Sequence, residues 1–115
     1  MPASLAAPAE RHALLNDLLE DSERLYHRNV TTIQKVYHAH WLKIVGEYVG
    51  RVQIEFPDEP PALVEAEVRS RLAPYRQDLR RVQSVLIAKE WELRAQRDRA
   101  IHCYVASLSA QAQAA

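Results

Sequence analysis

The amino-acid sequence predicts an all-α protein: a long antiparallel helical hairpin with a short intervening helix, within a helical bundle or coiled-coil assembly. Three observations support this fold class. Glycine is rare, with two residues among 115, where about eight would be usual at ~7%. The six prolines leave two long proline-free stretches, one before residue 57 and one after residue 74. In both stretches apolar residues recur at intervals of eleven, which is three helical turns, so each set falls in one stripe of a nearly straight helix.

The length fits a single domain, because domains typically have about 100 to 200 residues. We expect a flexible N-terminus at 1–9, a helical domain at 10–110 and a flexible tail at 109–115.

The first helix is expected over residues 10–55. Two other interpretations stay open for this stretch. Residues 51–56 alternate polar and apolar side chains after Gly50, which is typical of a short strand. Asn29 is a good N-cap, which would split the helix and give a compact bundle of four shorter helices. The apolar stripe of this helix consists of Tyr26, Val30, Ile33, Tyr37, Trp41, Ile44, Tyr48 and Val52.

The connector is expected at 56–61, where three prolines stand close together. A short amphipathic helix follows at 61–73, and a long helix follows at 75–108. Pro74 lies between them and either starts a new helix or kinks a continuing one, because proline lacks a backbone N–H and disfavours helical geometry in the residue before it. The apolar residues of the last helix are Tyr75, Leu79, Val82, Leu86, Leu93, Ile101, Tyr104 and Leu108, of which Val82, Leu93 and Tyr104 are spaced by eleven.

Two charged residues interrupt the stripe of the last helix. Glu90 and Arg97 stand where the period calls for apolar side chains. We therefore expect the seam between the helices to shift there toward Ile87 and Trp91.

Charge favours an antiparallel arrangement of the two long helices. Residues 10–23 carry five acids and one arginine, whereas the late part of the second stretch is basic. Folding about the connector brings Glu23 opposite Arg94 and Glu20 opposite Arg97, and such pairs select register and partner as flanking charges do in coiled coils.

The same pattern predicts a partner, because each helix carries more apolar surface than one seam covers. An exposed Ile, Val or Trp side chain forgoes roughly 1.5 to 3 kcal/mol of burial. We expect association as a homodimer or within a heteromeric complex, and a non-enzymatic structural or adaptor function through helix–helix contacts. The flanking residues are Val36, Val45, Val49, Val85, Ile87 and Trp91, and the expected interaction surface comprises Tyr26, Val30, Ile33, Tyr37, Trp41, Ile44, Tyr48, Leu86, Trp91, Leu93 and Ile101, with Trp41 and Trp91 as anchors.

The sequence predicts no catalytic, cofactor-binding or metal-ligating residues. Histidines that share an ion on a helix stand three or four residues apart, and none of the five does so. His38 and His40 lie about 200° apart around a helix axis. The lone Cys103 has no partner for an internal disulfide, and the shortage of glycine argues against phosphate-binding loops and nucleophile elbows.

A basic cluster offers an alternative function as a small nucleic-acid-associated protein. Five arginines, offset by Asp78 alone, lie within residues 69–81. Positions 69, 76 and 80 fall near one helical face, so a stripe of phosphate contacts is geometrically possible. The balance of fifteen basic and fifteen acidic residues gives no overall attraction to polyanions. The possible polyanion contacts are Arg69, Arg76, Arg80 and Arg81, with Arg71 beside them.

The remaining expectations concern location and the two glycines. No apolar run approaches the ~18 residues of a membrane span, and we expect a cytoplasmic protein without a signal peptide. A glycine inside a helix costs about 1 kcal/mol relative to alanine. Gly46 therefore indicates close packing of another backbone beside it, or a helix end.

Overall fold

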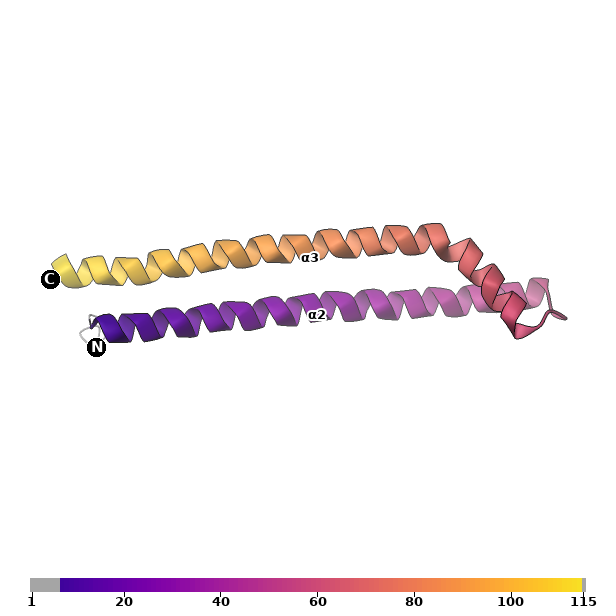
Figure 1. Cartoon of the computed structure of the whole chain (residues 1–115), viewed down its shortest axis with the longest axis horizontal. Coiled ribbons are helices and arrows are strands. Elements are labelled where there is room, and N and C mark those ends of the chain that lie inside the picture. Colours follow the sequence, from indigo (N-terminus) through magenta and orange to yellow (C-terminus); the bar gives the residue numbers. More distant parts are fainter. Residues whose placement is uncertain (1–6, 115) are drawn as a thin grey trace. The chain divides into compact units, whose positions relative to one another are not determined.

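The structure is a computed structural model that describes residues 7–114, with side chains through residue 111. Within this range the chain consists of two helices, α2 (Pro8–Glu55, 48 residues) and α3 (Pro61–Ala114, 54 residues), and contains no strand (Figure 1). The two helices pack antiparallel against each other. The predicted all-α helical hairpin is therefore confirmed.

Helix α2 is a single uninterrupted helix, in contrast to both alternative interpretations of this stretch. It begins at Pro8, within the expected flexible N-terminus, of which residues 1–6 lie outside the described range. Proline suits this position because the first helical N–H has no intrahelical acceptor. The helix passes through Asn29 and through residues 51–55, so both the break and the strand were wrong. Neither glycine of α2 has a positive φ that would end the helix early.

The connector between the helices consists of residues 56–60, because Pro61 already belongs to α3. The N–H of Phe56 donates to the carbonyl of Val52 at 2.8 Å and closes the last turn of α2. On the other side, the carbonyl of Pro60 accepts hydrogen bonds from Leu63 at 3.0 Å and Val64 at 3.2 Å. These bonds start α3 directly after the proline-rich segment.

Helix α3 runs through Pro74, so the separate short helix at 61–73 that we expected is instead the first part of one helix. Figure 1 shows α3 bent in its first third, the part that contains its interior proline. Proline removes one backbone hydrogen bond, and its ring clashes with the preceding helical turn. A helix that continues through a proline is therefore kinked there. At its other end α3 continues to Ala114, through most of the expected tail.

The described chain divides into two units. We call Thr31–Ile87 the turn unit, and residues 7–30 with 88–114 the end unit. Each unit contains a segment of α2 and a segment of α3.

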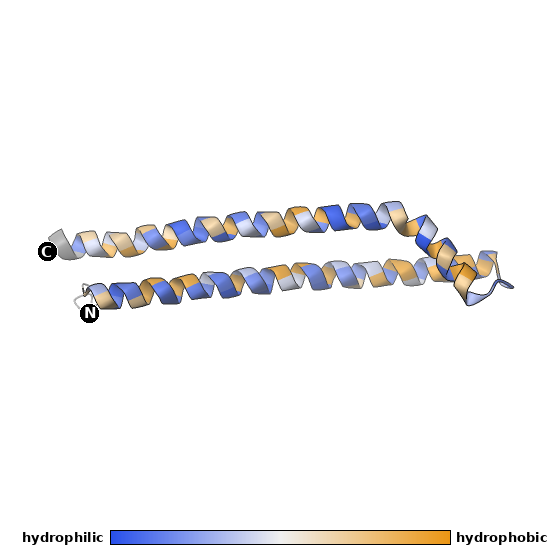
Figure 2. Cartoon of the chain, in the orientation of Figure 1, coloured by the Kyte–Doolittle hydropathy of each residue, from blue (hydrophilic) through white to orange (hydrophobic). Residues whose placement is uncertain are grey.

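The turn unit contains the apolar core. The first part of α3, before Pro74, lies against the end of α2, and Figure 2 shows hydrophobic residues gathered there. An ion-pair bridge on this part of α3 joins Arg71 to Glu55 of α2 and to Glu67 one turn earlier. The hydrogen bond from Arg71 holds the pKa of Glu55 below its ordinary value. The core consists of Val52, Val64, Val68 and Leu72, with Trp41, Ile44, Val45, Tyr48 and Val49 packed against it.

The end unit has a different interior. Its buried residues are Val105 and, unusually, the polar Ser22, which is 4% exposed. Most other side chains along its seam are half-buried.

Candidate protein-interaction surface

The apolar stripe predicted on α2 faces α3 of the same chain. All of its members except Val52 are half-buried, and Val52 is fully buried. The eleven-residue period was therefore a correct guide to the inner face of α2. The half-buried members are Tyr26, Val30, Ile33, Tyr37, Trp41, Ile44 and Tyr48.

Helix α3 contains two series of residues with the eleven-residue period, and the less apolar series faces α2. Leu79, Glu90 and Ile101 are half-buried in the seam. The fully apolar series lies three residues further along and stays at the surface, with Val82 45%, Leu93 38% and Tyr104 52% exposed. Residues three apart lie about 60° apart around a helix axis, so the two series are neighbours and the apolar one lies at the edge of the seam. The more hydrophobic series of α3 is thus the more exposed of the two.

Other predicted surface residues divide between exposed and covered positions. Leu86 and Trp91 are exposed and Ile101 is half-buried. Val36 and Val85 are exposed, as the surplus of apolar surface predicted. Val45 and Val49 were expected to flank an open seam but pack on the core, because the kinked first part of α3 covers them.

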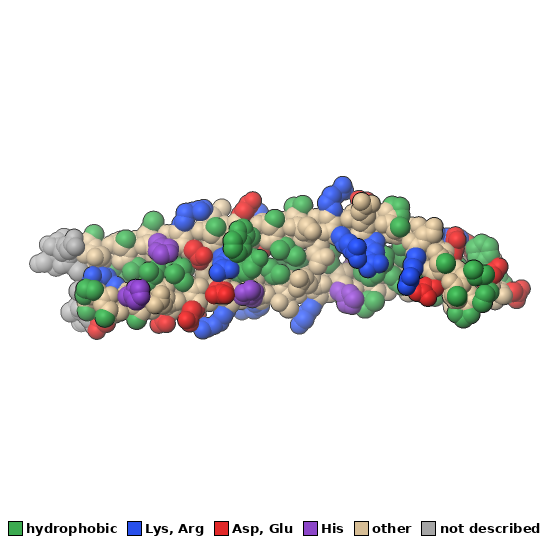
Figure 3. All heavy atoms as spheres, in the orientation of Figure 1, with side chains coloured by type: hydrophobic (Ala, Val, Ile, Leu, Met, Phe, Trp, Pro, Cys, Tyr) green, Lys and Arg blue, Asp and Glu red, His purple; other side chains and the backbone are tan. Residues whose placement is uncertain are grey.

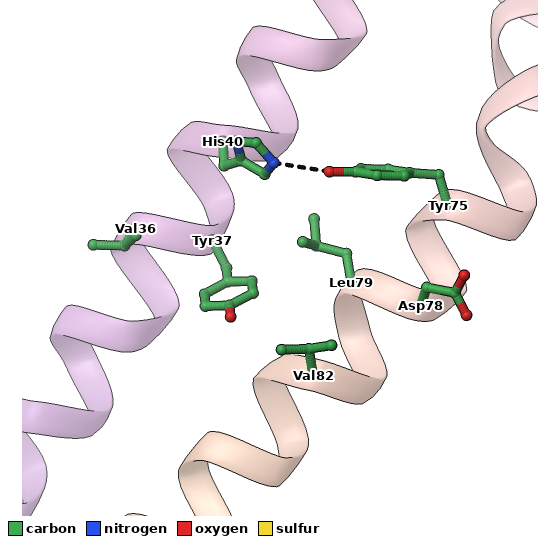
Figure 4. Close-up of a pocket in the computed structure, with 7 residues that line it drawn as sticks. All are labelled: Val36, Tyr37, His40, Tyr75, Asp78, Leu79 and Val82. Atoms are coloured by element: carbon green, nitrogen blue, oxygen red, sulfur yellow. Dashed lines mark hydrogen bonds between the residues drawn. The ribbon is translucent and has the colours of Figure 1, made fainter.

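An apolar groove runs between α2 and α3 in the turn unit. It has a volume of about 370 Å³. Val36 and Val82 line it from opposite helices (Figure 4). His40 Nε2 and the Tyr75 hydroxyl are hydrogen-bonded across the groove at 2.8 Å. The other lining residues are Tyr37, Asp78 and Leu79.

A polar groove of about 300 Å³ lies on the other side of the same helix pair. Tyr37 and Leu79 line both grooves and so form the wall between them. On the polar side, the guanidinium of Arg76 lies 5.3 Å from the ring centre of Trp41, which is cation–π distance. The remaining lining residues are Gln34, His38, Arg80 and Gln83.

The basic cluster is largely paired with acids of the same unit. Arg69 lies 2.6 Å from Glu65 and Arg81 lies 3.2 Å from Asp78, while Arg71 is held by two glutamates. Basic and acidic side chains are interspersed over the face shown in Figure 3. Of the predicted polyanion contacts, Arg76 and Arg80 are the two that line the polar groove.

A polar cluster of Ser22, Asn29, Glu90 and Arg97 occupies the seam of the end unit. The amide of Asn29 donates to Glu90 Oε1 at 2.7 Å, and Arg97 lies 3.8 Å from the same oxygen. Arg97 also donates to the hydroxyl of Ser22 at 3.4 Å and to its carbonyl at 3.5 Å. Glu90 and Arg97 stay in the seam, because partners on α2 satisfy these side chains where they stand, so the expected shift away from them was wrong. Ile87, toward which the shift was expected, is half-buried. Ser22 precedes Ile33 by eleven residues, so the period itself indicated its inward position.

The predicted charge register was close but not correct in detail. Arg97 reaches Ser22 rather than Glu20. Arg94 pairs with Asp98 at 3.7 Å rather than with Glu23. Within the described residues, Glu20 and Glu23 instead pair along their own helix, with Arg24 and His27.

Trp91 contacts α2 through one edge although it is 56% exposed. Its ring meets Tyr26 edge-on, with centroids 5.6 Å apart. The guanidinium of Arg94 lies 5.3 Å from both rings. The remaining surface of Trp91 is open.

No protein-family model, curated protein or solved structure matches this chain.

The remaining features of the described residues concern metal binding, membrane spans, the cysteine and Gly46. No group of three or more His, Cys, Asp or Glu side chains among them could hold a metal ion. No helix in the described range is long and apolar enough to cross a membrane. Cys103 is a free, exposed thiol. Gly46 lies inside α2 with nothing within 4 Å of where a Cβ would stand, so the expected close backbone neighbour is wrong for this chain by itself.

Proposed function

We propose that this protein is a non-enzymatic structural or adaptor subunit that works by binding other helices. The observation that supports this function best is the exposed apolar series of α3, Val82, Leu93 and Tyr104. These side chains stay 38 to 52% exposed after α2 and α3 have packed against each other. Fully burying a side chain of this kind contributes roughly 1.5 to 3 kcal/mol, so each of them forgoes about half of that.

The exposed apolar surface also has a form that suits a helical partner. The apolar groove lies between two antiparallel helices, and a third helix packed over such a groove extends the pair toward a bundle. We further propose a cytoplasmic setting, in which the exposed thiol of Cys103 would stay reduced.

The polyanion alternative has weaker support, because carboxylates of the same unit hold Arg69, Arg71 and Arg81. A phosphate would have to displace these partners. Retention on heparin that falls steeply with salt, and is lost when Arg76, Arg80 and Arg81 are changed to glutamine, would favour the alternative.

The test of the proposed function is the mass of the native particle. Tagged protein is expressed in its source cells at its natural level, and the cleared extract is analysed by gel filtration and crosslinking. We expect the chain in a particle clearly larger than 13.2 kDa. Elution as a free single chain, before and after crosslinking, would contradict the proposal.

A further inference from the structure

We propose that an acidic amphipathic helix of a partner protein lies in a trough on one face of the turn unit, with its carboxylates on Arg76 and Arg80. This inference rests on the proposed function and names the chemistry of the partner. The trough consists of the polar groove and of a wide groove of about 640 Å³ next to it. Trp41 of α2 and Arg76 of α3 line both grooves and so mark the point where they meet.

The lining residues show that the two grooves follow each other along one face of the helix pair. On α2 they stand at positions 34, 38 and 41 in the polar groove and at 45, 49 and 53 in the wide groove. On α3 they stand at 83, 80 and 76 in the polar groove and at 72, 69 and 65 in the wide groove. Residues three or four apart lie on the same face of a helix. One helix laid along this face can therefore reach both grooves.

The polar groove has positive charge that the described residues do not compensate. No carboxylate is among the residues that line it. The other three arginines of the basic cluster are paired with acids. Arg76 and Arg80 have no acidic partner in the described part of the chain, and Arg76 instead lies over the ring of Trp41. The groove therefore favours an occupant that brings carboxylates.

The spacing of the two arginines suits a helical occupant. Arg76 and Arg80 stand one turn apart on α3, so two acids one turn apart on a facing helix would meet them. The turn unit already contains a contact of this kind, because Arg71 of α3 pairs with Glu55 of α2. Arginine also binds carboxylates through two parallel hydrogen bonds, which makes such pairs specific in direction.

The wide groove suits the apolar face of the same helix. Its carboxylate Glu65 is paired with Arg69 at 2.6 Å, and Glu59 belongs to the connector, at the end of the trough away from Arg80. An incoming helix therefore needs apolar side chains here and acids only toward the polar groove. The apolar lining residues on the two helices, besides Trp41, are Val45, Val49, Val64, Val68 and Leu72.

A nucleic acid suits the trough less well. Its phosphates repeat at short, regular intervals, and binding strength grows with the number of phosphates that basic residues neutralise. The trough offers two unpaired arginines and then an apolar section. A polypeptide with acids at one end and apolar residues at the other fits both sections.

The experiment uses the full chain in its source cells, with a photo-reactive amino acid in place of Gln34 in the polar groove or of Gln53 in the wide groove. Both side chains are exposed. Mass spectrometry identifies the segment to which each position crosslinks. We expect both to reach one helix of one partner protein, with acids one turn apart near the first crosslink and apolar residues near the second. The same amino acid in place of Lys43, which is exposed and lines neither groove, should not reach that segment.

The segment is then synthesised and titrated into the purified full chain. Arg76→Glu together with Arg80→Glu should weaken binding at least ~10-fold, because two attractions become repulsions. Lysines in place of the acids of the peptide should restore its binding to this variant. The matched control, Lys35→Glu with Lys43→Glu, makes the same change in charge on exposed residues of the turn unit and should bind like the unmodified chain.

Circular dichroism shows whether the helices of each variant persist, and Arg76→Gln with Arg80→Gln replaces a glutamate variant that does not fold. A crosslinked segment without acids, a segment of a second copy, or equal weakening by the lysine control would overturn the inference. Crosslinks to nucleic acid would overturn it in favour of the polyanion alternative. A large native particle in which neither groove position reaches a polypeptide would also overturn it, and the proposed function would stand. A chain that is free of any partner in its source cells would remove both.

Discussion

The turn unit and the end unit use the same two helices but different interiors. In the turn unit, four buried aliphatic side chains form a core to which Val64, Val68 and Leu72 come from the part of α3 before Pro74. In the end unit, a cluster of hydrogen-bonded polar side chains occupies the seam, and Val105 is the one buried aliphatic residue among those described.

This difference assigns different tasks to the two units. Apolar burial supplies most of the stability of a fold, whereas buried polar groups add little net stability and restrict the alternatives. A polar pair in a helical seam disfavours slipped registers, because any slip leaves a buried donor or acceptor without its partner. We therefore expect the turn unit to hold the hairpin together and the end unit to select its register.

The largest expected effect is in the turn unit. Leu72→Ala should lower the free energy of unfolding by about 2 to 5 kcal/mol, because Leu72 is 2% exposed and its loss leaves a cavity. Chemical denaturation followed by circular dichroism measures the change. Leu63→Ala is the control, since that side chain is exposed in the same helix and should cost at most about 0.5 kcal/mol. Equal losses in the two variants would mean that the core is not where the structure places it.

A smaller effect is expected in the end unit. Glu90→Ala should cost about 1 to 3 kcal/mol, because it leaves the half-buried amide of Asn29 without its acceptor and Arg97 without its carboxylate. Glu92→Ala, which removes an exposed glutamate paired with Lys89, serves as the control. Thermal unfolding compares the two, and the idea of a polar seam fails if Glu92→Ala is as costly as Glu90→Ala.

The smallest effect has the opposite sign. Gly46→Ala should stabilise the protein by about 0.5 to 1 kcal/mol, because alanine restricts the unfolded chain and prefers the helix. The site has room, since nothing lies within 4 Å of the added Cβ. The midpoint of thermal unfolding should rise. A fall would show that another backbone lies beside Gly46 in the assembled protein.

The eleven-residue period predicted both helices and the inner face of α2, because it records which side of a helix avoids water, and the prolines predicted the connector. It could not decide the inner face of α3. Val82, Leu93 and Tyr104 have the same spacing as Leu79, Glu90 and Ile101, and they are the more apolar set. Glu90 is half-buried in the seam because Asn29 stands opposite and donates to it, and a pattern of apolar residues on one helix holds no information about that neighbour.

Pro74 shows a similar limit. Proline is unfavourable inside a helix, so its position indicated either a break or a kink. The choice depends on packing before and after it, and Val68 and Leu72 continue the buried face up to the kink. The position of the apolar groove likewise could not be predicted, because it depends on how the two helices pack. The sequence predicted only that some apolar surface would remain exposed.

The two tryptophans fall one in each unit, Trp41 in the turn unit and Trp91 in the end unit. Replacing either with phenylalanine leaves a single tryptophan, whose emission reports on one unit alone. The opening of each unit during denaturation is thus visible separately on one chain, and a lag between the two signals would measure directly how unequally they resist unfolding.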